Sequence, residues 1–233
     1  MHWTWTPRVA AAVLRGQTQT MAGEELKDQP PVYQTARMEA FSDGVFAIAI
    51  TLLVLEIGVP HGSGDDLLSA LVEQWPSYLT YLVSFSTIGA VWISHTVITE
   101  YLHRANSVVI RLNLLLLLVV AFLPFPTRLL GEYIGEYEPE RVATTVYGVN
   151  LLLASALVSI IWRYSVHEKL VRPDADDEDV RSLTRRLTPS FAGYVVMIAT
   201  GLFVPTIAVL GYLLIAVYII VPFGLIRHGQ RQP

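Results

Sequence analysis

The sequence predicts an all-α integral membrane protein with six transmembrane helices per subunit. Three observations support this fold class: few residues are charged, the charges lie between apolar runs, and those runs are as long as a membrane crossing. The chain has 233 residues, of which 53% are hydrophobic and 15% are charged, and its mean hydropathy is +0.47. Soluble domains carry about 25% charged residues, so the composition favours a membrane protein.

The composition also bears on partners and metal sites. The formal net charge is −4, which gives no reason to expect binding to nucleic acid. The chain has no cysteine, which excludes disulfides and cysteine-ligated zinc or iron–sulfur sites. The partner that the composition does indicate is the lipid bilayer.

The apolar runs define the predicted crossings. A helix needs about 20 apolar residues to cross about 30 Å of hydrocarbon. The last apolar stretch, Thr188 to Ile226, is about twice that length. We therefore expect two helices there, with a break near Pro205, because proline disrupts the interior of a helix. The predicted spans are residues 38–59, 76–99, 108–129, 142–162, 188–205 and 207–226.

The basic residues predict the orientation of the chain. Lys and Arg collect on the cytoplasmic side of membrane proteins. With both termini in the cytoplasm, only Arg128 and Arg141 of the 16 basic residues fall on the outer side. We expect a flexible cytoplasmic extension over residues 1–35, a six-helix transmembrane domain over 36–227 and a cytoplasmic tail over 228–233.

Polar residues mark the cytoplasmic end of the first span. Asp43 lies about 9 Å along the helix from Arg37, near the inner membrane boundary. The second span ends in the same layer with His95, and the third begins there with Asn113. Because buried polar groups need partners, we expect Asp43 to accept hydrogen bonds from Arg37 or His95. The predicted network contains Arg37, Ser42, Asp43, His95 and Asn113.

This network has two interpretations. It either clamps the first three helices together or also takes part in gating or proton sensing through His95, because histidine titrates near neutral pH. A single histidine more often has a structural role, so the first interpretation is favoured.

Another face of the first span is apolar. At about 100° per residue, Ile48, Leu52 and Leu55 lie within about 60° of one another, and Thr51 lies at the edge of this stripe. Asp43 points about 140° away from Ile48. Helical spacing alone leaves lipid contact, core packing and pore lining open for the stripe.

The first three spans contain distinctive motifs. They are Arg37-x-x-x-Phe41-Ser42-Asp43 in the first span, Trp92-x-x-His95 in the second, and the run from Asn113 to Leu123-Pro124-Phe125-Pro126-Thr127 in the third. With these motifs the chain resembles the prokaryotic relatives of the lysosomal potassium channel called transmembrane protein 175. The resemblance covers residues 37–130, whereas the last three helices agree only in number and position.

The resemblance implies a function. It implies a homotetramer in the bacterial plasma membrane whose first helices line a central pore that conducts potassium in preference to sodium. Ile48, Leu52 and Leu55 would form a hydrophobic constriction, and Thr51 would contribute to selectivity. The chain would have no cofactor and no enzymatic activity. Glu56, near the outer end of the span, would either raise the local cation concentration or be a plain interfacial carboxylate.

Two other functions remain open. A secondary transporter of a cation or small solute commonly has internal repeats and broken helices, and the six spans show no repeat. A non-conducting structural membrane protein is also compatible with an apolar stripe. An enzyme is disfavoured because the spans contain no pair of His-rich motifs, nucleophile elbow or carboxylate pair.

Overall fold

The computed structural model describes residues 35–58 and 66–229. Within these ranges the regular elements are helices, apart from an isolated antiparallel bridge between Leu102 and Val171. The predicted extension over residues 1–35 and the tail over 228–233 fall almost entirely outside the described residues.

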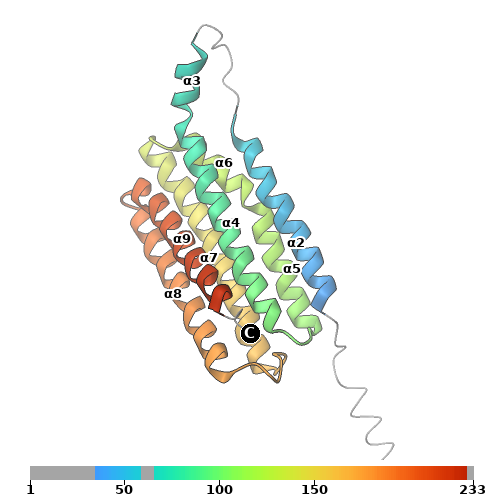
Figure 1. The fold of residues 1–233 in the computed structure, drawn as a ribbon. Coiled ribbons are helices and arrows are strands. Elements are labelled where there is room, and N and C mark those ends of the chain that lie inside the picture. Colours follow the sequence, from blue (N-terminus) through green and yellow to red (C-terminus); the bar gives the residue numbers. More distant parts are fainter. Residues whose placement is uncertain (1–34, 59–65, 230–233) are drawn as a thin grey trace, which may run out of the picture.

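The long helices lie side by side in one bundle, and α2 begins at the same end of the bundle at which α9 finishes (Figure 1). Each predicted span overlaps one helix or two consecutive helices. The elements are α2 (Thr35–Leu52) with the 3₁₀ helix η1 (Leu53–Glu56), α3 (Leu67–Glu73), α4 (Trp75–Tyr101), α5 (Ser107–Phe122), α6 (Pro124–Tyr133), α7 (Tyr137–His167), α8 (Asp177–Gly201) and α9 (Pro205–Gly229).

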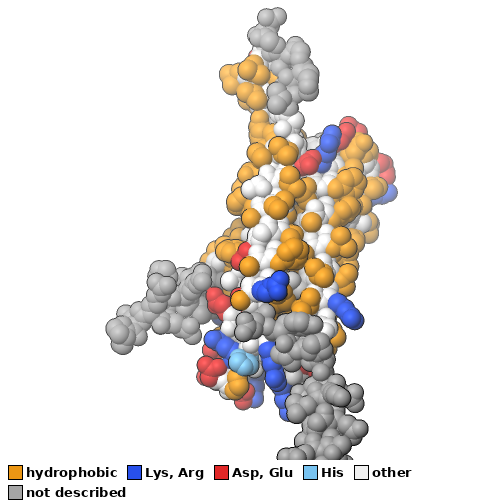
Figure 2. Space-filling view, turned by 90° about the vertical axis from the view of Figure 1, so that its right-hand side faces the viewer, with side chains coloured by type: hydrophobic (Ala, Val, Ile, Leu, Met, Phe, Trp, Pro, Cys, Tyr) orange, Lys and Arg blue, Asp and Glu red, His pale blue; other side chains and the backbone are white. Residues whose placement is uncertain are grey.

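Four helical segments of the described chain are long and apolar enough to cross a membrane. They are Thr35–Glu56, Trp75–Tyr101, Ser107–Tyr133 and Tyr137–His167. Hydrophobic side chains cover the middle of one face of the bundle, and charged side chains gather towards its two ends (Figure 2). This distribution is that of a multi-pass membrane protein, in which charges avoid the hydrocarbon.

The long C-terminal apolar stretch is broken near Pro205, where the sequence predicts. α8 ends at Gly201, and the amides of Phe203 and Val204 both donate to the carbonyl of Thr200, at 3.0 and 2.8 Å. α9 then begins with Pro205. Proline suits the first position of a helix because the amide hydrogen that it lacks would have no partner inside the helix.

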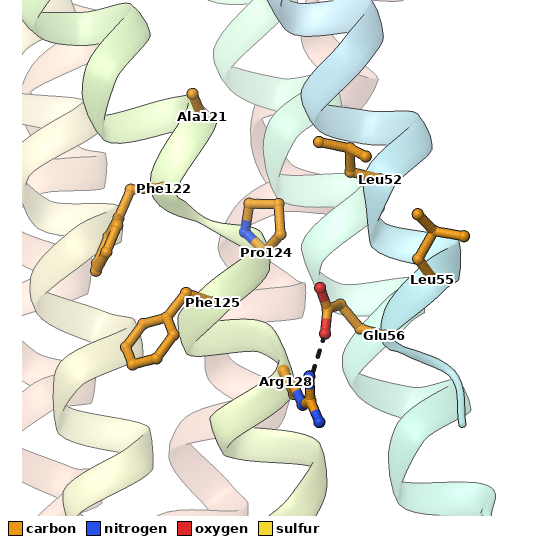
Figure 3. Close-up of a pocket in the computed structure, with 8 residues that line it drawn as sticks. All are labelled: Leu52, Leu55, Glu56, Ala121, Phe122, Pro124, Phe125 and Arg128. Carbon is orange, nitrogen blue, oxygen red and sulfur yellow. Dashed lines mark ion pairs between the residues drawn. The ribbon is translucent and has the colours of Figure 1, made fainter. Parts of the chain in front are cut away.

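The third predicted span is interrupted between α5 and α6. The amide of Leu123 donates to the carbonyl of Val120, three residues earlier, at 3.1 Å, so the chain makes a 3₁₀ turn here that is tighter than an α-helical turn. Pro124 and Pro126 follow at once. Each removes a backbone donor and crowds the preceding turn, so the helix restarts in a new direction that carries Arg128 towards η1 (Figure 3).

The short helix α3 lies in the predicted outer loop and was not expected from the sequence. The side chain of Asp66 caps it by accepting a hydrogen bond from the amide of Ser69 at 3.2 Å. Four large apolar residues between Leu67 and Val72 are exposed. α3 extends beyond the end of the bundle, next to α4 (Figure 1).

α2 lies at the edge of the bundle, where it packs against α4 and α5. In the most apolar stretch of the segment Thr35–Glu56, only 28% is buried in the bundle, compared with 50% for the corresponding stretch of α4 and 44% for that of α7. The residues that attach it to the core are Phe46 and Ala49, together with Leu53 of η1. The remaining apolar surface of α2 is therefore left uncovered by the described residues of one copy.

Candidate functional site

Three of the five predicted network residues form a buried hydrogen-bond chain in the N-terminal half of α2, which is its predicted inner end. Asn113 Nδ2 donates to Ser42 Oγ at 2.9 Å, and Ser42 Oγ donates to the carbonyl of Met38 at 2.8 Å. Asn113 Oδ1 accepts a hydrogen bond from Nε2 of His95 at 2.8 Å. Ser42, His95 and Asn113 are buried. They come from α2, α4 and α5, so these hydrogen bonds link the first three spans in the layer that the sequence predicts.

Asp43 has a different donor from the two that were predicted. Its Oδ1 accepts a hydrogen bond from Nε1 of Trp92 at 2.8 Å, and both side chains are exposed. Between the described side chains of Asp43, Arg37 and His95 there is no hydrogen bond or ion pair. The prediction that Asp43 accepts from Arg37 or His95 is therefore corrected to acceptance from Trp92.

Helix rotation explains this correction. Arg37 and Ile48 are eleven residues apart, which is about three turns, so both lie on the exposed face of α2. Asp43 is turned by about 100° from Ser42 and faces the exposed edge of α4. Trp92 lies three residues before His95, one turn along α4, and this spacing is the sequence signal that identifies it as a neighbour of the network.

The predicted constriction residues lie on the uncovered face of α2 and of η1, which continues it and contains Leu55. Ile48, Leu52 and Leu55 are 61%, 41% and 72% exposed. Thr51 is also exposed, and its hydroxyl lies 2.9 Å from the carbonyls of both Ala47 and Ile48. Exposure is required of a residue that lines a pore between copies, and it equally fits a residue that faces lipid.

Leu52, Leu55 and Glu56 form one wall of an outer pocket of about 340 Å³ (Figure 3). The break between α5 and α6 supplies the opposite wall. The residues of that wall are Ala121, Phe122, Pro124, Phe125 and Arg128. The outer pocket is mostly apolar and has a single pair of opposite charges at its rim.

That pair consists of Glu56 and Arg128. Glu56 Oε2 lies 3.9 Å from Nε of Arg128, and the two side chains are 23% and 70% exposed. Glu56 is the last residue of η1, and it faces α6 and a basic residue (Figure 3). The sequence predicted only that Arg128 lies on the outer side of the membrane, because the change of direction at Pro124 was not anticipated.

A second opening, the inner groove, lies on the other side of α2. It has a volume of about 400 Å³ and separates α2 from α4. The inner groove is lined by Asp43, Phe46, Ala47, Ile50, Ile88, Gly89 and Trp92. There is space beside its two helices, because an added Cβ at Gly44 of α2 or at Gly89 of α4 would meet no atom within 4 Å. The exposed face of α2 is therefore bordered by an opening on each side.

Comparison with known proteins identifies the family. Residues 37–124 match the model of the endosomal/lysosomal potassium channel TMEM175. A potassium channel of Streptomyces collinus is 38% identical over 187 residues, which cover 79% of this chain and 91% of that protein. The chain belongs to the TMEM175 family. The matched range contains every residue of the hydrogen-bond chain and of the exposed stripe on α2.

Two further similarities extend over most of the chain. A potassium channel of Chamaesiphon minutus is 40% identical over 163 residues, which cover 68% of this chain and 80% of that protein. The crystal structure of a lysosomal potassium-selective channel TMEM175 homolog from the same organism superposes with a TM-score of 0.74 at 35% identity. That superposition covers 81% of this chain and 97% of the homolog, so it includes helices beyond the range of the family model.

Proposed function

We propose that copies of this chain form a potassium-selective cation channel in the bacterial plasma membrane, with α2 lining a central pore. The observation that carries the proposal is the attachment of α2 to its bundle by one face only. The opposite face, with Ile48, Leu52 and Leu55, is left exposed. In a family whose bacterial relatives are named potassium channels, an uncovered first helix is the element best placed to line a shared pore.

The proposal includes six crossings with both termini in the cytoplasm. α8 and α9 would complete the six, because they pack against α7 and α4 and run alongside them (Figure 1). An even number of crossings agrees with α2 beginning and α9 ending at the same end of the bundle (Figure 1). Basic residues at that end agree with a cytoplasmic orientation, and they include Arg104, Arg163, Lys169 and Arg172.

The proposed assembly is a homotetramer. In a ring of identical copies, one flank of α2 meets a different surface of the next copy. The exposed flank beside α4 has the small residues Ala40, Gly44 and Ala47. Small residues allow membrane helices to approach closely, and close packing drives their association where the hydrophobic effect is absent. This flank can therefore bring neighbouring first helices together around the axis.

Conduction through this pore would be passive. Rings of Ile48, Leu52 and Leu55 make a narrow apolar constriction, which excludes ions when it loses its water. A slight widening or rotation would bring Thr51 towards the axis. Its hydroxyl hydrogen is used by the carbonyls of Ala47 and Ile48, so its oxygen keeps a lone pair for a partly dehydrated cation. Potassium loses water more easily than sodium, which gives the preference.

The buried chain of Ser42, His95 and Asn113 has a supporting role in this proposal. It fixes the rotation of α2 relative to α4 and α5. Because Ser42 must face the bundle, Ile48 and Leu55 must face away from it. The network thus aims the stripe at the proposed pore.

The test compares Ile48→Asn with Ile160→Asn in purified proteoliposomes. Ile160, on α7, is 47% exposed, against 61% for Ile48, so the control makes the same chemical change on another exposed surface. We expect potassium flux above sodium flux in the wild type. In Ile48→Asn the flux or the ratio should change several-fold, and in Ile160→Asn it should not.

Other outcomes would count against the proposal. Equal changes in both variants would show a general effect of asparagine in the membrane rather than a constriction at α2. Saturable flux that depends on a second ion would indicate a secondary transporter. Sealed vesicles with inserted protein and no flux of either ion would indicate a non-conducting structural protein.

A further inference from the structure

We propose that Arg128 sets the electrostatic potential at the outer mouth of the pore by opposing the carboxylate of Glu56. In this proposal Arg128 limits the entry of external cations, so its removal increases inward current. The inference rests on the proposed function, because it requires that α2 lines the path of the ion.

The geometry places Arg128 beside the proposed conduction path. Arg128 and Leu55 line the same outer pocket, and the guanidinium points across that pocket towards Glu56 (Figure 3). Leu55, 72% exposed, lies on the stripe that would face the axis. A charge on this rim therefore lies close to the place where an external cation would meet the outermost apolar ring.

The charge of Arg128 is only partly neutralised. Its Nε lies 3.9 Å from Glu56 Oε2, which is beyond hydrogen-bond distance. The arginine side chain is 70% exposed, whereas that of Glu56 is 23% exposed. The guanidinium is thus the more accessible member of the pair, and an approaching cation meets the positive charge before the negative one.

The physical effect of Arg128 depends on salt. The local concentration of a cation varies exponentially with potential, so one unopposed carboxylate per subunit raises cation entry. Screening limits the reach of that charge to about 30 Å at 0.01 M salt and about 3 Å at 1 M salt. Loss of Arg128 should therefore increase inward current strongly at low ionic strength and hardly at all at high ionic strength.

The chain provides a matched control in a second outer ion pair. Arg141 Nη2 lies 2.8 Å from Glu138 Oε2, within one turn of α7. Arg141 has the same charge and is predicted on the same side of the membrane, but it does not line the outer pocket. Arg141→Gln therefore removes an equal charge from the same face at a site away from α2.

The test measures inward potassium current under voltage clamp in external solutions of about 0.01 M and about 1 M salt, where screening differs about tenfold in length. Arg128→Gln should raise the current about two- to threefold in low salt and leave it near the wild-type value in high salt. Arg128→Lys and Arg141→Gln should both behave as the wild type. The double variant Glu56→Gln with Arg128→Gln should return the current towards the wild-type level.

Several results would overturn the inference. An equal rise in Arg141→Gln would assign the effect to overall surface charge. If Arg128→Gln changed the inward current equally at both salt concentrations, the role of Arg128 would be to support the packing of η1 against α6 and not to set the potential. Normal wild-type current with an unchanged Arg128→Gln would overturn this inference alone, whereas absence of potassium current in the wild type would overturn the proposed function as well.

Discussion

The two ends of α2 are attached to the bundle by different means. At the inner end, Ser42, His95 and Asn113 form a buried chain of neutral hydrogen bonds between 2.8 and 2.9 Å. At the outer end, Leu53 of η1 is buried in the core, and the polar contact is an ion pair of 3.9 Å between Glu56 and Arg128 on the rim of an open pocket. The buried groups of Ser42, His95 and Asn113 cannot reach water as an alternative partner, whereas the charged groups of Glu56 and Arg128 can.

This difference indicates which end of α2 is fixed. Breaking a buried hydrogen bond leaves polar groups without partners, which costs more than the bond itself contributes. An exposed ion pair exchanges its partner for water at little cost. The backbone differs in the same sense, because the outer end is the 3₁₀ helix η1, whose hydrogen-bond geometry is poorer than that of an α-helix. We infer that the polar contacts hold the inner end of α2 more firmly than the outer end.

The largest effect is expected at the inner end. Asn113→Leu removes the donor to Ser42 and the acceptor for His95, so we expect a loss of about 2–4 kcal/mol in the free energy of unfolding. Asn150→Leu is the control, because Asn150 is also buried and makes one long hydrogen bond, 3.3 Å, to the carbonyl of Val119. Unfolding in detergent would measure both. If Asn150→Leu lost as much stability as Asn113→Leu, the hydrogen bonds among Ser42, His95 and Asn113 would have no special role in stability.

A smaller effect is expected beside these buried hydrogen bonds. Trp92→Phe keeps an aromatic ring but removes the hydrogen bond to Asp43, and both partners are exposed. We expect a loss of about 1 kcal/mol in the free energy of unfolding. Trp75→Phe controls for the smaller ring, since no indole hydrogen bond of Trp75 is seen to the described residues. A loss as large as that of Asn113→Leu would show that this exposed contact holds α2 as firmly as the buried ones.

The smallest effect on stability is expected at the outer end. Glu56→Gln should lower the free energy of unfolding by less than about 0.5 kcal/mol, because ion pairs near the surface contribute little. Glu140→Gln is the contrast: Glu140 is buried, and it accepts hydrogen bonds from the amide of Gly135 at 3.1 Å and the hydroxyl of Thr206 at 2.9 Å. Its substitution should cost about 1.5–3 kcal/mol. Equal losses in the two variants would contradict a weak polar contact at the outer end.

The polar layer was predictable because membrane crossings fix the height of each residue. A helix of known length and direction places Ser42, His95 and Asn113 near the same membrane face. The structure pairs them although Ser42 and Asn113 are 71 residues apart. Height alone does not fix rotation about the helix axis, and this is why the partner of Asp43 is Trp92, 49 residues away, and not Arg37 or His95.

Local hydropathy and backbone chemistry make the helical class, the positions of the apolar segments and the break at Pro205 predictable from the sequence. Helical spacing likewise predicts that Ile48, Leu52 and Leu55 share one face of the first span. The packing of the bundle is needed to show that this face is exposed, that Arg128 faces Glu56, and that the buried hydrogen bonds hold the inner end of α2. These features depend on how helices distant in sequence rotate and bend against one another, and no local pattern specifies that packing.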